Sequence, residues 1–290
     1  MTTFKQKRAH NIGVGVLVIG ELPEFSDLSL KSMANVGITR ICFVADKNGS
    51  DWISRKSFEL SEVLFCRHEN LEITREVASL GDEGEYVEFG EKKFFLLMIL
   101  KWLLILDMWK RHRDLEFSLF SDLDVAWRKN IELKDLSELK GEKVLAIQDD
   151  SRGKDRVFYC PGIMIWRKTP NSEKLIKNIY EYQRDEILLG QVLPDDKALN
   201  FYLNKESLHH LVTTLNRKLF VIGHRFPYLM AGVKGFRIRK VVAFHANYAR
   251  GSKVKNFYLK ASLIHPGNPL RIFYLARFLK WRILGNLVKF

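Results

Sequence analysis

Hydrophobic residues fall into short, β-branched runs that alternate with longer amphipathic segments. Residues 14–19 and 38–45 are apolar runs of strand length, and they predict strands that are buried on both faces. Residues 93–109 form the most apolar stretch of the chain. Lys101 and Asp107 interrupt this stretch, which predicts a buried helix and not a membrane span.

The same alternation continues through the rest of the chain. Thr169 followed by Pro170 predicts a helix start, because threonine caps a first turn and proline fits its first position. Further helices are expected at residues 27–36 and 195–204, and further strands at residues 62–66, 117–125, 144–148, 163–166 and 241–245. Strands that alternate with helices predict an α/β fold, with a single domain built on a Rossmann-like, mostly parallel sheet flanked by helices.

The composition shows that the chain carries a net positive charge. The 290 residues include 47 Lys and Arg against 34 Asp and Glu, a formal net charge of +13, which attracts anions such as phosphates, acidic lipids or nucleic acid. Cys42, Cys66 and Cys160 are odd in number and far apart in the sequence, so no disulfide framework is expected, and Cys42, inside an apolar run, is expected to be buried. We recognise no targeting segment and expect a cytoplasmic protein of a bacterium or of a virus-infected host cell.

Two aspartates, Asp122 and Asp124, stand one residue apart near the end of the run at residues 117–125. Alternate residues of a strand share one face, so both carboxylates are expected to project together at the carboxyl end of this strand, where open α/β sheets bind ligands. Carboxylates this close repel each other unless a proton or a cation lies between them. A divalent cation suits these oxygen ligands and leaves positions for phosphate oxygens. The alternative is a turn cap at Asp122 and a solvated Asp124.

The stretch FSLFSDLDVAWRKN, residues 117–130, resembles the Asp-x-Asp segment of nucleotide-diphospho-sugar transferases with the GT-A fold. The closest likeness is to the plant and algal xylosyl-, arabinosyl- and galactosyltransferases. Three more segments agree in order: the helix around Lys101, LPDDKALN at residues 193–200, and HANYARGSKVK at residues 245–255. The chain departs from this pattern at Ile131, where the family usually has proline, and the departure does not affect the aspartates.

The resemblance implies a divalent metal, Mn²⁺ or Mg²⁺, held by Asp122, Asp124 and His245. Asp122 would bind this metal or the nucleotide ribose, and Lys255 would pair with the diphosphate. The metal would stabilise the charge that builds on the leaving nucleoside diphosphate. The alternatives are a hydrogen-bonded histidine at a strand end for His245 and a solvated surface charge for Lys255.

Two other residues are candidates for binding the nucleotide. Asp46, at the end of the second expected strand, resembles the acidic residue that meets the base or the ribose, and a plain turn residue is the alternative. Lys101 stands on an apolar helix, where it either reaches the nucleotide or extends its side chain to water.

Asp195 is the candidate catalytic residue, and Asp196 is its neighbour in reserve. A carboxylate near the anomeric carbon can orient the acceptor hydroxyl, act as a base or shield a cationic sugar. Both residues stand where a helix is expected to begin, so stabilisation of the helix N-terminus is a second role that is compatible with catalysis. The family usually has glutamine where this chain has Asp196, which bears on which sugar is transferred.

The resemblance therefore implies a glycosyltransferase that moves a hexose or pentose from a nucleotide-diphosphate donor to a glycan, glycoprotein or lipid-linked acceptor. A UDP-sugar is favoured, with xylose or galactose as the leading sugars. The alternatives are a metal-dependent nucleotidyltransferase and a non-enzymatic, basic nucleic-acid-binding protein. We find no zinc-ligand spacing, Arg-rich arm or RNA-stacking motif in the sequence, so nucleic acid is not the expected partner.

We expect the GT-A domain to span residues 1–265 and a basic, apolar helix to follow at residues 266–290. A basic amphipathic helix at residues 268–290 would contact an anionic membrane surface peripherally. Its apolar residues run almost all the way round the helix, however, which favours packing into protein or between subunits.

Overall fold

The chain forms two compact units in a computed structural model, and each unit is assembled from separate segments. The structure describes residues 12–20, 22–68, 92–131, 136, 138–151, 157–191, 193–247, 249, 251–265, 268–270, 272–274 and 276–277. Unit 1 takes residues 1–22, 38–122 and 131–214, and unit 2 takes residues 23–37, 123–130 and 215–290. The helix expected at residues 266–290 lies largely outside the described residues, so this helix and the boundary at residue 265 stay predictions.

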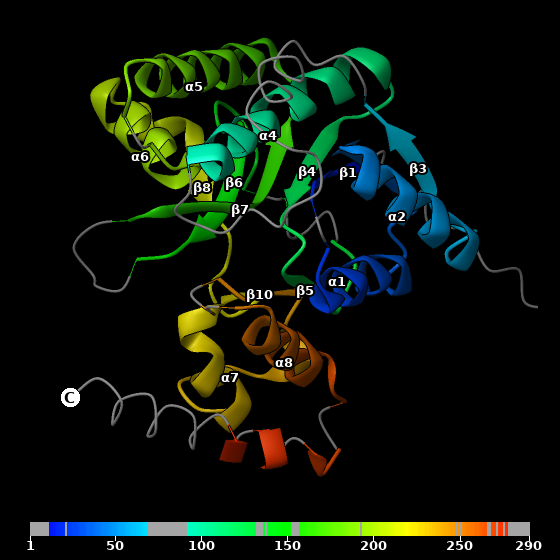
Figure 1. Cartoon of the computed structure of the whole chain (residues 1–290). Helices are drawn as coiled ribbons and strands as arrows, with labels where there is room; N and C mark the ends of the chain where they lie inside the picture. Colours follow the sequence, from blue (N-terminus) through cyan, green and yellow to red (C-terminus); the bar gives the residue numbers. More distant parts are fainter. Residues whose placement is uncertain are drawn as a thin grey trace, which may run out of the picture. The chain divides into compact units, whose positions relative to one another are not determined.

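Unit 1 is built on a seven-stranded sheet with the strand order β3-β2-β1-β4-β7-β6-β8 (Figure 1). Its strands are β1 (Ile12–Val18), β2 (Arg40–Ala45), β3 (Leu64–Arg67), β4 (Phe117–Ser121), β6 (Leu145–Asp149), β7 (Tyr159–Arg167) and β8 (Val212–Thr214). Strand β7 runs antiparallel to β4 and β6, and the other neighbours pair in parallel. The expected mostly parallel sheet is confirmed.

The helices of unit 1 are α2 (Lys47–Glu59), α4 (Lys92–Arg111), α5 (Pro170–Leu188) and α6 (Asp195–Lys205), with a short 3₁₀ turn at His209–Leu211. Helix α4 packs on β1, β2 and β4 and against α5, and its apolar side chains form the centre of the main core (Figure 1). The buried helix expected at residues 93–109 is confirmed. Among the helices of the described residues, none combines the length and apolarity needed to cross a bilayer.

Two glycines in β1 let α4 approach the sheet closely. A Cβ atom added to Gly15 would stand 3.1 Å from side-chain atoms of Leu104 and Met108, and one added to Gly13 would stand 3.0 Å from side-chain atoms of Met108 and Leu115. Glycine in a strand interior often marks such a close approach. The helix that carries Lys101 is therefore held directly against the strands at the centre of the sheet.

Unit 2 has a three-stranded sheet with the order β5-β10-β9, formed by β5 (Val125–Trp127), β10 (Ala243–His245) and β9 (Phe220–Ile222). Its helices are α1 (Glu24–Asn35), α7 (Phe226–Ala231) and α8 (Ser252–Leu263), with 3₁₀ turns at Gly223–Arg225 and Ile238–Lys240. Helix α1 packs on β5 and α8 (Figure 1). The core is aromatic, and the stacked rings of Phe226 and Tyr258 have centroids 4.4 Å apart.

The expectation of one strand over residues 117–125 is wrong, because β4 ends at Ser121. The backbone N–H of Asp122 donates to the carbonyl of Gly162 at 2.8 Å, and the chain then turns into β5, which pairs antiparallel with β10. Hydrophobic residues continue through both strands, so the apolar pattern does not mark the break. Asp122 and Asp124 therefore lie in a turn between two strands, not on one face of a single strand.

Candidate functional site

Lys101 joins two of the predicted site residues within unit 1. Its ammonium lies 2.6 Å from Oδ2 of Asp195 and 3.0 Å from Oδ1 of Asp122, and it stands 5.0 Å from the ring centroid of Phe120. Only 2% of the Lys101 side chain is exposed. The alternative of a lysine that extends to water is therefore excluded, and the charge in the middle of this apolar helix is explained by two carboxylates.

The buried ammonium of Lys101 stays charged. Burial alone would lower the pKa of Lys101, because an apolar surrounding disfavours the charged form. The carboxylates of Asp122 and Asp195 outweigh burial and raise the pKa above its usual value. The group thus contains one fixed positive charge between two carboxylates. Asp122 follows the end of β4, and Asp195 lies in the first turn of α6.

Asp195 and Asp196 occupy the first turn of helix α6, as expected. Pro194 is the N-cap residue, and no side chain among the described residues caps this end. Burial, followed by the charge of Asp195, raises the pKa of Asp196 to about 6. Asp195 therefore faces Lys101, whereas its neighbour is a carboxyl group poised near neutral pH.

A polar residue that carried no assigned role in the sequence analysis fixes the start of α6. Asn200 is buried, its Oδ1 accepts from the backbone N–H of Tyr159 at 2.9 Å, and its Nδ2 donates to the Tyr159 carbonyl at 2.8 Å. These two bonds tie α6 to β7. Asn200 is the last residue of the segment LPDDKALN, so the motif contained a signal for it. The motif did not reveal that Asn200 positions α6 by binding the backbone of Tyr159.

Asp46 follows β2, as predicted, but its side chain is used by its own loop. Oδ1 accepts from the N–H of Gly49 at 2.8 Å and caps α2, and Oδ2 accepts from the N–H of Gly20 at 2.8 Å. A Cβ at Gly49 would stand 1.8 Å from the carbonyl oxygen of Val18, so the turn requires glycine there. Contact of Asp46 with a nucleotide stays a prediction.

Asp124, His245 and Lys255 come together within unit 2. Oδ1 of Asp124 lies 3.1 Å from Nε2 of His245, and Oδ2 lies 2.7 Å from the ammonium of Lys255. Asp124 and His245 are buried, and 25% of the Lys255 side chain is exposed. The burial of Asp124 excludes the alternative of a solvated carboxylate.

The sheet of unit 2 aligns this group. Val125, next to Asp124, pairs with His245 across β5 and β10, and the N–H of Ala246 donates to the Asp124 carbonyl at 2.9 Å. Lys255 reaches Asp124 from helix α8 and passes over the ring of Phe25, 5.4 Å from its centroid. Three segments that are distant in the sequence thus converge on one carboxylate.

The charge state of Asp124 is set by its neighbours. Burial opposes ionisation, but Lys255 and His245 outweigh it and hold the pKa of Asp124 well below its usual range. The Oδ1 atom facing His245 is buried and makes no regular hydrogen bond within the described part of the chain. A carboxylate oxygen beside an imidazole nitrogen is a donor set that fits a divalent cation.

The sequence pattern of the nucleotide-diphospho-sugar transferase family matches residues 63–259, well over half of the chain. The chain belongs to this family. The match includes the turn with Asp122 and Asp124, the start of α6, His245 and Lys255. The resemblance expected from the Asp-x-Asp segment is confirmed at the level of the family.

Solved structures show that this nucleotide-diphospho-sugar transferase has the GT-A fold. Mouse xyloside xylosyltransferase 1 in its apo form is similar with a TM-score of 0.52 and 12% sequence identity, over 82% of this chain and 98% of that one. The galactosyltransferase LgtC, in complex with donor and acceptor sugar analogues, has a TM-score of 0.52 and 11% identity, over 93% and 99%. None of the curated proteins compared with the transferase matches it.

The structure of the transferase thus groups seven of the eight predicted site residues. Unit 1 brings Lys101 to Asp122 and Asp195, with Asp196 beside Asp195, and unit 2 brings His245 and Lys255 to Asp124. Asp46 caps a helix instead. The ion pairs of Lys101 and Lys255 were not foreseen, because their members are far apart in the sequence.

Proposed function

We propose that this nucleotide-diphospho-sugar transferase is a metal-dependent glycosyltransferase that uses a UDP-sugar, with xylose or galactose as the leading sugars. The observation that carries the proposal is the buried pair of Asp124 and His245, in a chain of this family. The acceptor is a hydroxyl group of a glycan, glycoprotein or lipid-linked sugar, and this part rests on the family resemblance.

Asp124 and His245 would hold the metal, and Asp122, two residues before Asp124 in the sequence, would be the third protein ligand. Mn²⁺ suits this mixture of carboxylate and imidazole better than Mg²⁺, which prefers an all-oxygen shell. When bound, the metal supplies positive charge that stabilises the departing diphosphate.

Lys255 has a defined part in this arrangement. Its ammonium lies beside the Asp124 carboxylate and balances its charge. A divalent cation on Asp124 would take over this neutralisation, and Lys255 would then be available to a phosphate oxygen. The exposed quarter of its side chain and its flexible stem suit such a change of partner.

The two carboxylates at the start of α6 would serve the acceptor. Lys101 holds Asp195 in one position, so Asp195 would orient the acceptor hydroxyl or shield a cationic sugar. The pKa of about 6 puts Asp196 closer to the range of a general base than an ordinary aspartate. Asp196 would take the proton of the hydroxyl, while Asn200 keeps the helix start in place.

A panel of UDP- and GDP-sugars, incubated with the full chain and Mn²⁺, tests the proposal. Slow hydrolysis reveals the donor even without an acceptor, and we expect free UDP from UDP-xylose or UDP-galactose. Chelation by EDTA should stop the release, and added Mn²⁺ should restore it. Release of pyrophosphate would identify a nucleotidyltransferase instead, and full turnover under tight chelation would contradict the metal role.

A further inference from the structure

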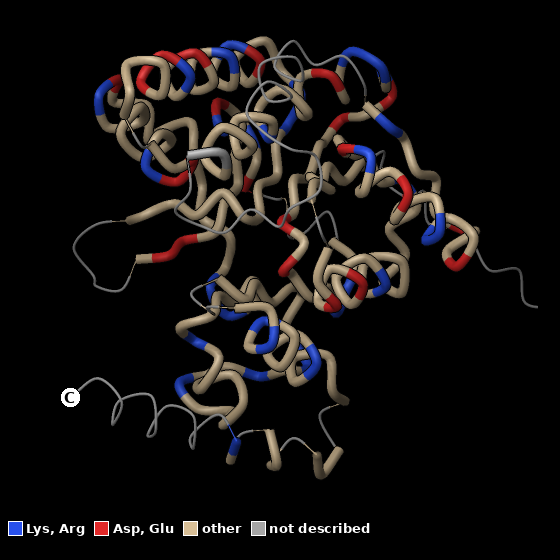
Figure 2. The backbone as a smooth tube through the Cα atoms, viewed as in Figure 1, with Lys and Arg blue, Asp and Glu red and all other residues tan. Residues whose placement is uncertain are grey.

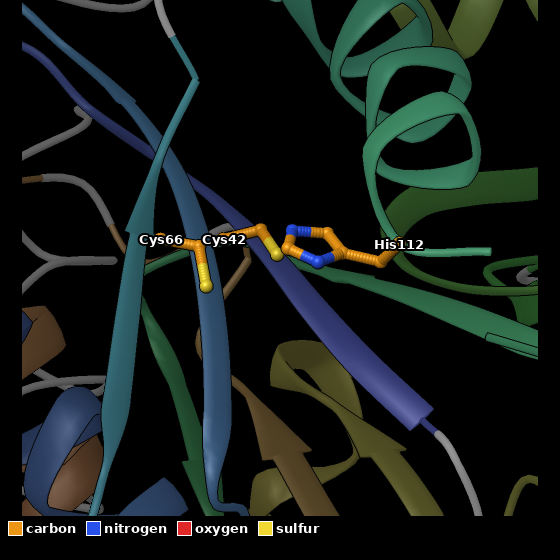
Figure 3. Close-up of side chains that lie close together, drawn as sticks. All are labelled: Cys42, Cys66 and His112. Atoms are coloured by element: carbon orange, nitrogen blue, oxygen red, sulfur yellow. The ribbon is translucent and has the colours of Figure 1, made fainter. Parts of the chain in front are cut away.

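Two cysteines and a histidine that play no part in the groups described above lie together in unit 1. Cys42 on β2 and Cys66 on β3 are direct partners across two parallel strands, and His112 follows the last residue of α4. Both Sγ atoms and one imidazole nitrogen lie within 4.8 Å of one another. Figure 3 shows the ring of His112 pointing toward the two cysteines.

The two thiols of this cluster hydrogen-bond to each other, whereas one nitrogen of the histidine is buried without a partner in the described residues. Cys42 is fully buried, and Cys66 and His112 are partly buried. Nε2 of His112 is buried and finds no hydrogen-bond partner in the described residues. A buried nitrogen left without a partner is costly, by about 1–3 kcal/mol, so the position calls for a ligand.

A second histidine beside the cluster has the same feature. His68 is 98% buried, and its ring centroid lies 5.5 Å from that of His112. Its Nδ1 lies 2.7 Å from Oδ2 of Asp107, whereas its Nε2 is buried and unpartnered within the ranges that the structure describes. Metal-binding histidines are commonly oriented in this way, by a carboxylate on one ring nitrogen while the other meets the metal.

We propose that Cys42, Cys66 and His112 bind a Zn²⁺ ion, with His68 as the fourth ligand. Two thiolates and two imidazoles form a tetrahedral set that suits zinc, whereas Mg²⁺ and Mn²⁺ prefer oxygen. Each thiol gives its proton to solvent when the metal binds, and no electron transfer is needed. The ion ties β2, β3 and the end of α4 together.

This site does not depend on the proposed function. Its residues are separate from Asp124 and His245, whose proposed ligand atoms are oxygen and nitrogen. The sequence did not reveal the cluster, because Cys66 and His68 form only a Cys-x-His pair and Cys42 and His112 are far from that pair in the sequence. Pairing of two parallel strands brings the thiols together, and that pairing is visible only in the fold.

Cobalt is a probe that separates the two sites. The full chain would be stripped of metal under a phosphine reductant and titrated with Co²⁺ alone. We expect one equivalent to produce sulfur-to-cobalt charge-transfer bands and the strong visible bands of tetrahedral coordination, and Zn²⁺ to displace them. The oxygen and nitrogen ligands proposed for the sugar-nucleotide metal cannot give the charge-transfer bands.

Matched variants assign the bands to these residues. Cys66→Ser and His112→Asn should abolish or blue-shift the bands, and His68→Asn should weaken Zn²⁺ affinity at least about tenfold. Cys160→Ser is the control, since Cys160 lies on β7 and should leave the spectrum unchanged. The proposal is overturned if the reduced wild-type chain shows no charge-transfer bands, if Cys66→Ser keeps them intact, or if Cys42 and Cys66 form a disulfide in protein that binds no metal when reduced.

Discussion

The two units of this transferase differ sharply in charge. Residues 215–290, all in unit 2, contain 16 of the 47 Lys and Arg residues and none of the 34 Asp and Glu residues. In Figure 2, only Lys and Arg colour the described chain beyond β8. The net charge of +13 therefore comes from unit 2. Such a positive unit suits a diphosphate, whereas unit 1 contributes the carboxylates proposed for the acceptor.

The same contrast holds around the two ion-pair groups. In unit 1 a single cation, Lys101, lies between two carboxylates. In unit 2 a single carboxylate, Asp124, lies between a lysine and a histidine. The first arrangement fixes a cation permanently in the core. The second holds an anion whose partners can change, because Lys255 is partly exposed and a histidine can bind a metal ion when its imidazole is neutral.

Removing the charge of Asp124 tests the difference between the two ion-pair groups most strongly. Asp124→Asn should lower kcat/KM for the UDP-sugar at least about 10³-fold, or about 4 kcal/mol, because the metal loses its charged ligand. UDP release with Mn²⁺ measures the loss, and circular dichroism checks the fold. Asp185→Asn, at an exposed position of α5, is the control and should retain activity. Equal activity of the two variants would contradict the role of Asp124.

Removing the cation of unit 1 should act mainly on stability. Lys101→Met leaves two carboxylates without their shared partner, and the free energy of unfolding should fall by about 3–5 kcal/mol. Urea unfolding measures this change. Lys110→Met, at an exposed position of the same helix, should stay within about 0.5 kcal/mol of the wild type. A Lys101 variant as stable as this control would show that the buried ion pairs contribute nothing net.

The raised pKa of Asp196 predicts a dependence of stability on pH. Because the folded protein holds this proton up to about pH 6 and the unfolded chain releases it near 4, the free energy of unfolding should fall as pH rises between these values. The loss is at most about 3 kcal/mol, and solvent near the partly exposed side chain reduces it. Urea unfolding at pH 4.5 and 7 measures it.

Asp196→Asn isolates this effect from other titrating groups. The asparagine carries no charge, so the variant should show a smaller fall in stability across the same pH interval. An unchanged pH profile would mean that the burial of Asp196 and the charge of Asp195 do not raise its pKa.

The smallest expected effect concerns the changeable partner of Asp124. Lys255→Met removes the ammonium that competes with a divalent cation, so Mn²⁺ should bind about fivefold more tightly in the absence of nucleotide, or about 1 kcal/mol. Titration calorimetry measures this change. Lys253→Met, exposed on the same helix, should leave the affinity unchanged. Weaker Mn²⁺ binding in the Lys255 variant would show that Lys255 supports the metal and does not compete with it.

The sequence predicted much of the fold, because its strongest signals are local. The apolar strands at residues 14–19 and 38–45 and the Thr169-Pro170 helix start are confirmed by β1, β2 and α5, and Thr169 Oγ1 accepts from the N–H of Ser172 as a cap should. Helix α8 and the strands β5 and β9 were not predicted, whereas the strand expected at residues 241–245 is confirmed by β10. Three-residue strands such as β5 and β9 are too short for an alternating pattern to appear.

The candidate residues were found one by one, but their partnerships were not. Lys101 left two explanations open in the sequence, and only the fold brings Asp195 to it from the start of α6. The break after Ser121 was missed because the apolar run continues across it. Local pattern thus identifies unusual residues, whereas strand pairing and helix packing decide what they meet.

The ammonium of Lys101 also has a consequence for which arrangements of unit 1 are stable. The centre of the apolar helix α4 carries a positive charge, which is paired only when the end of β4 and the start of α6 are both in place. Burial of this ammonium without its carboxylate partners would be energetically costly. Any arrangement of unit 1 that covers this helix without both carboxylates is therefore less stable than the complete one.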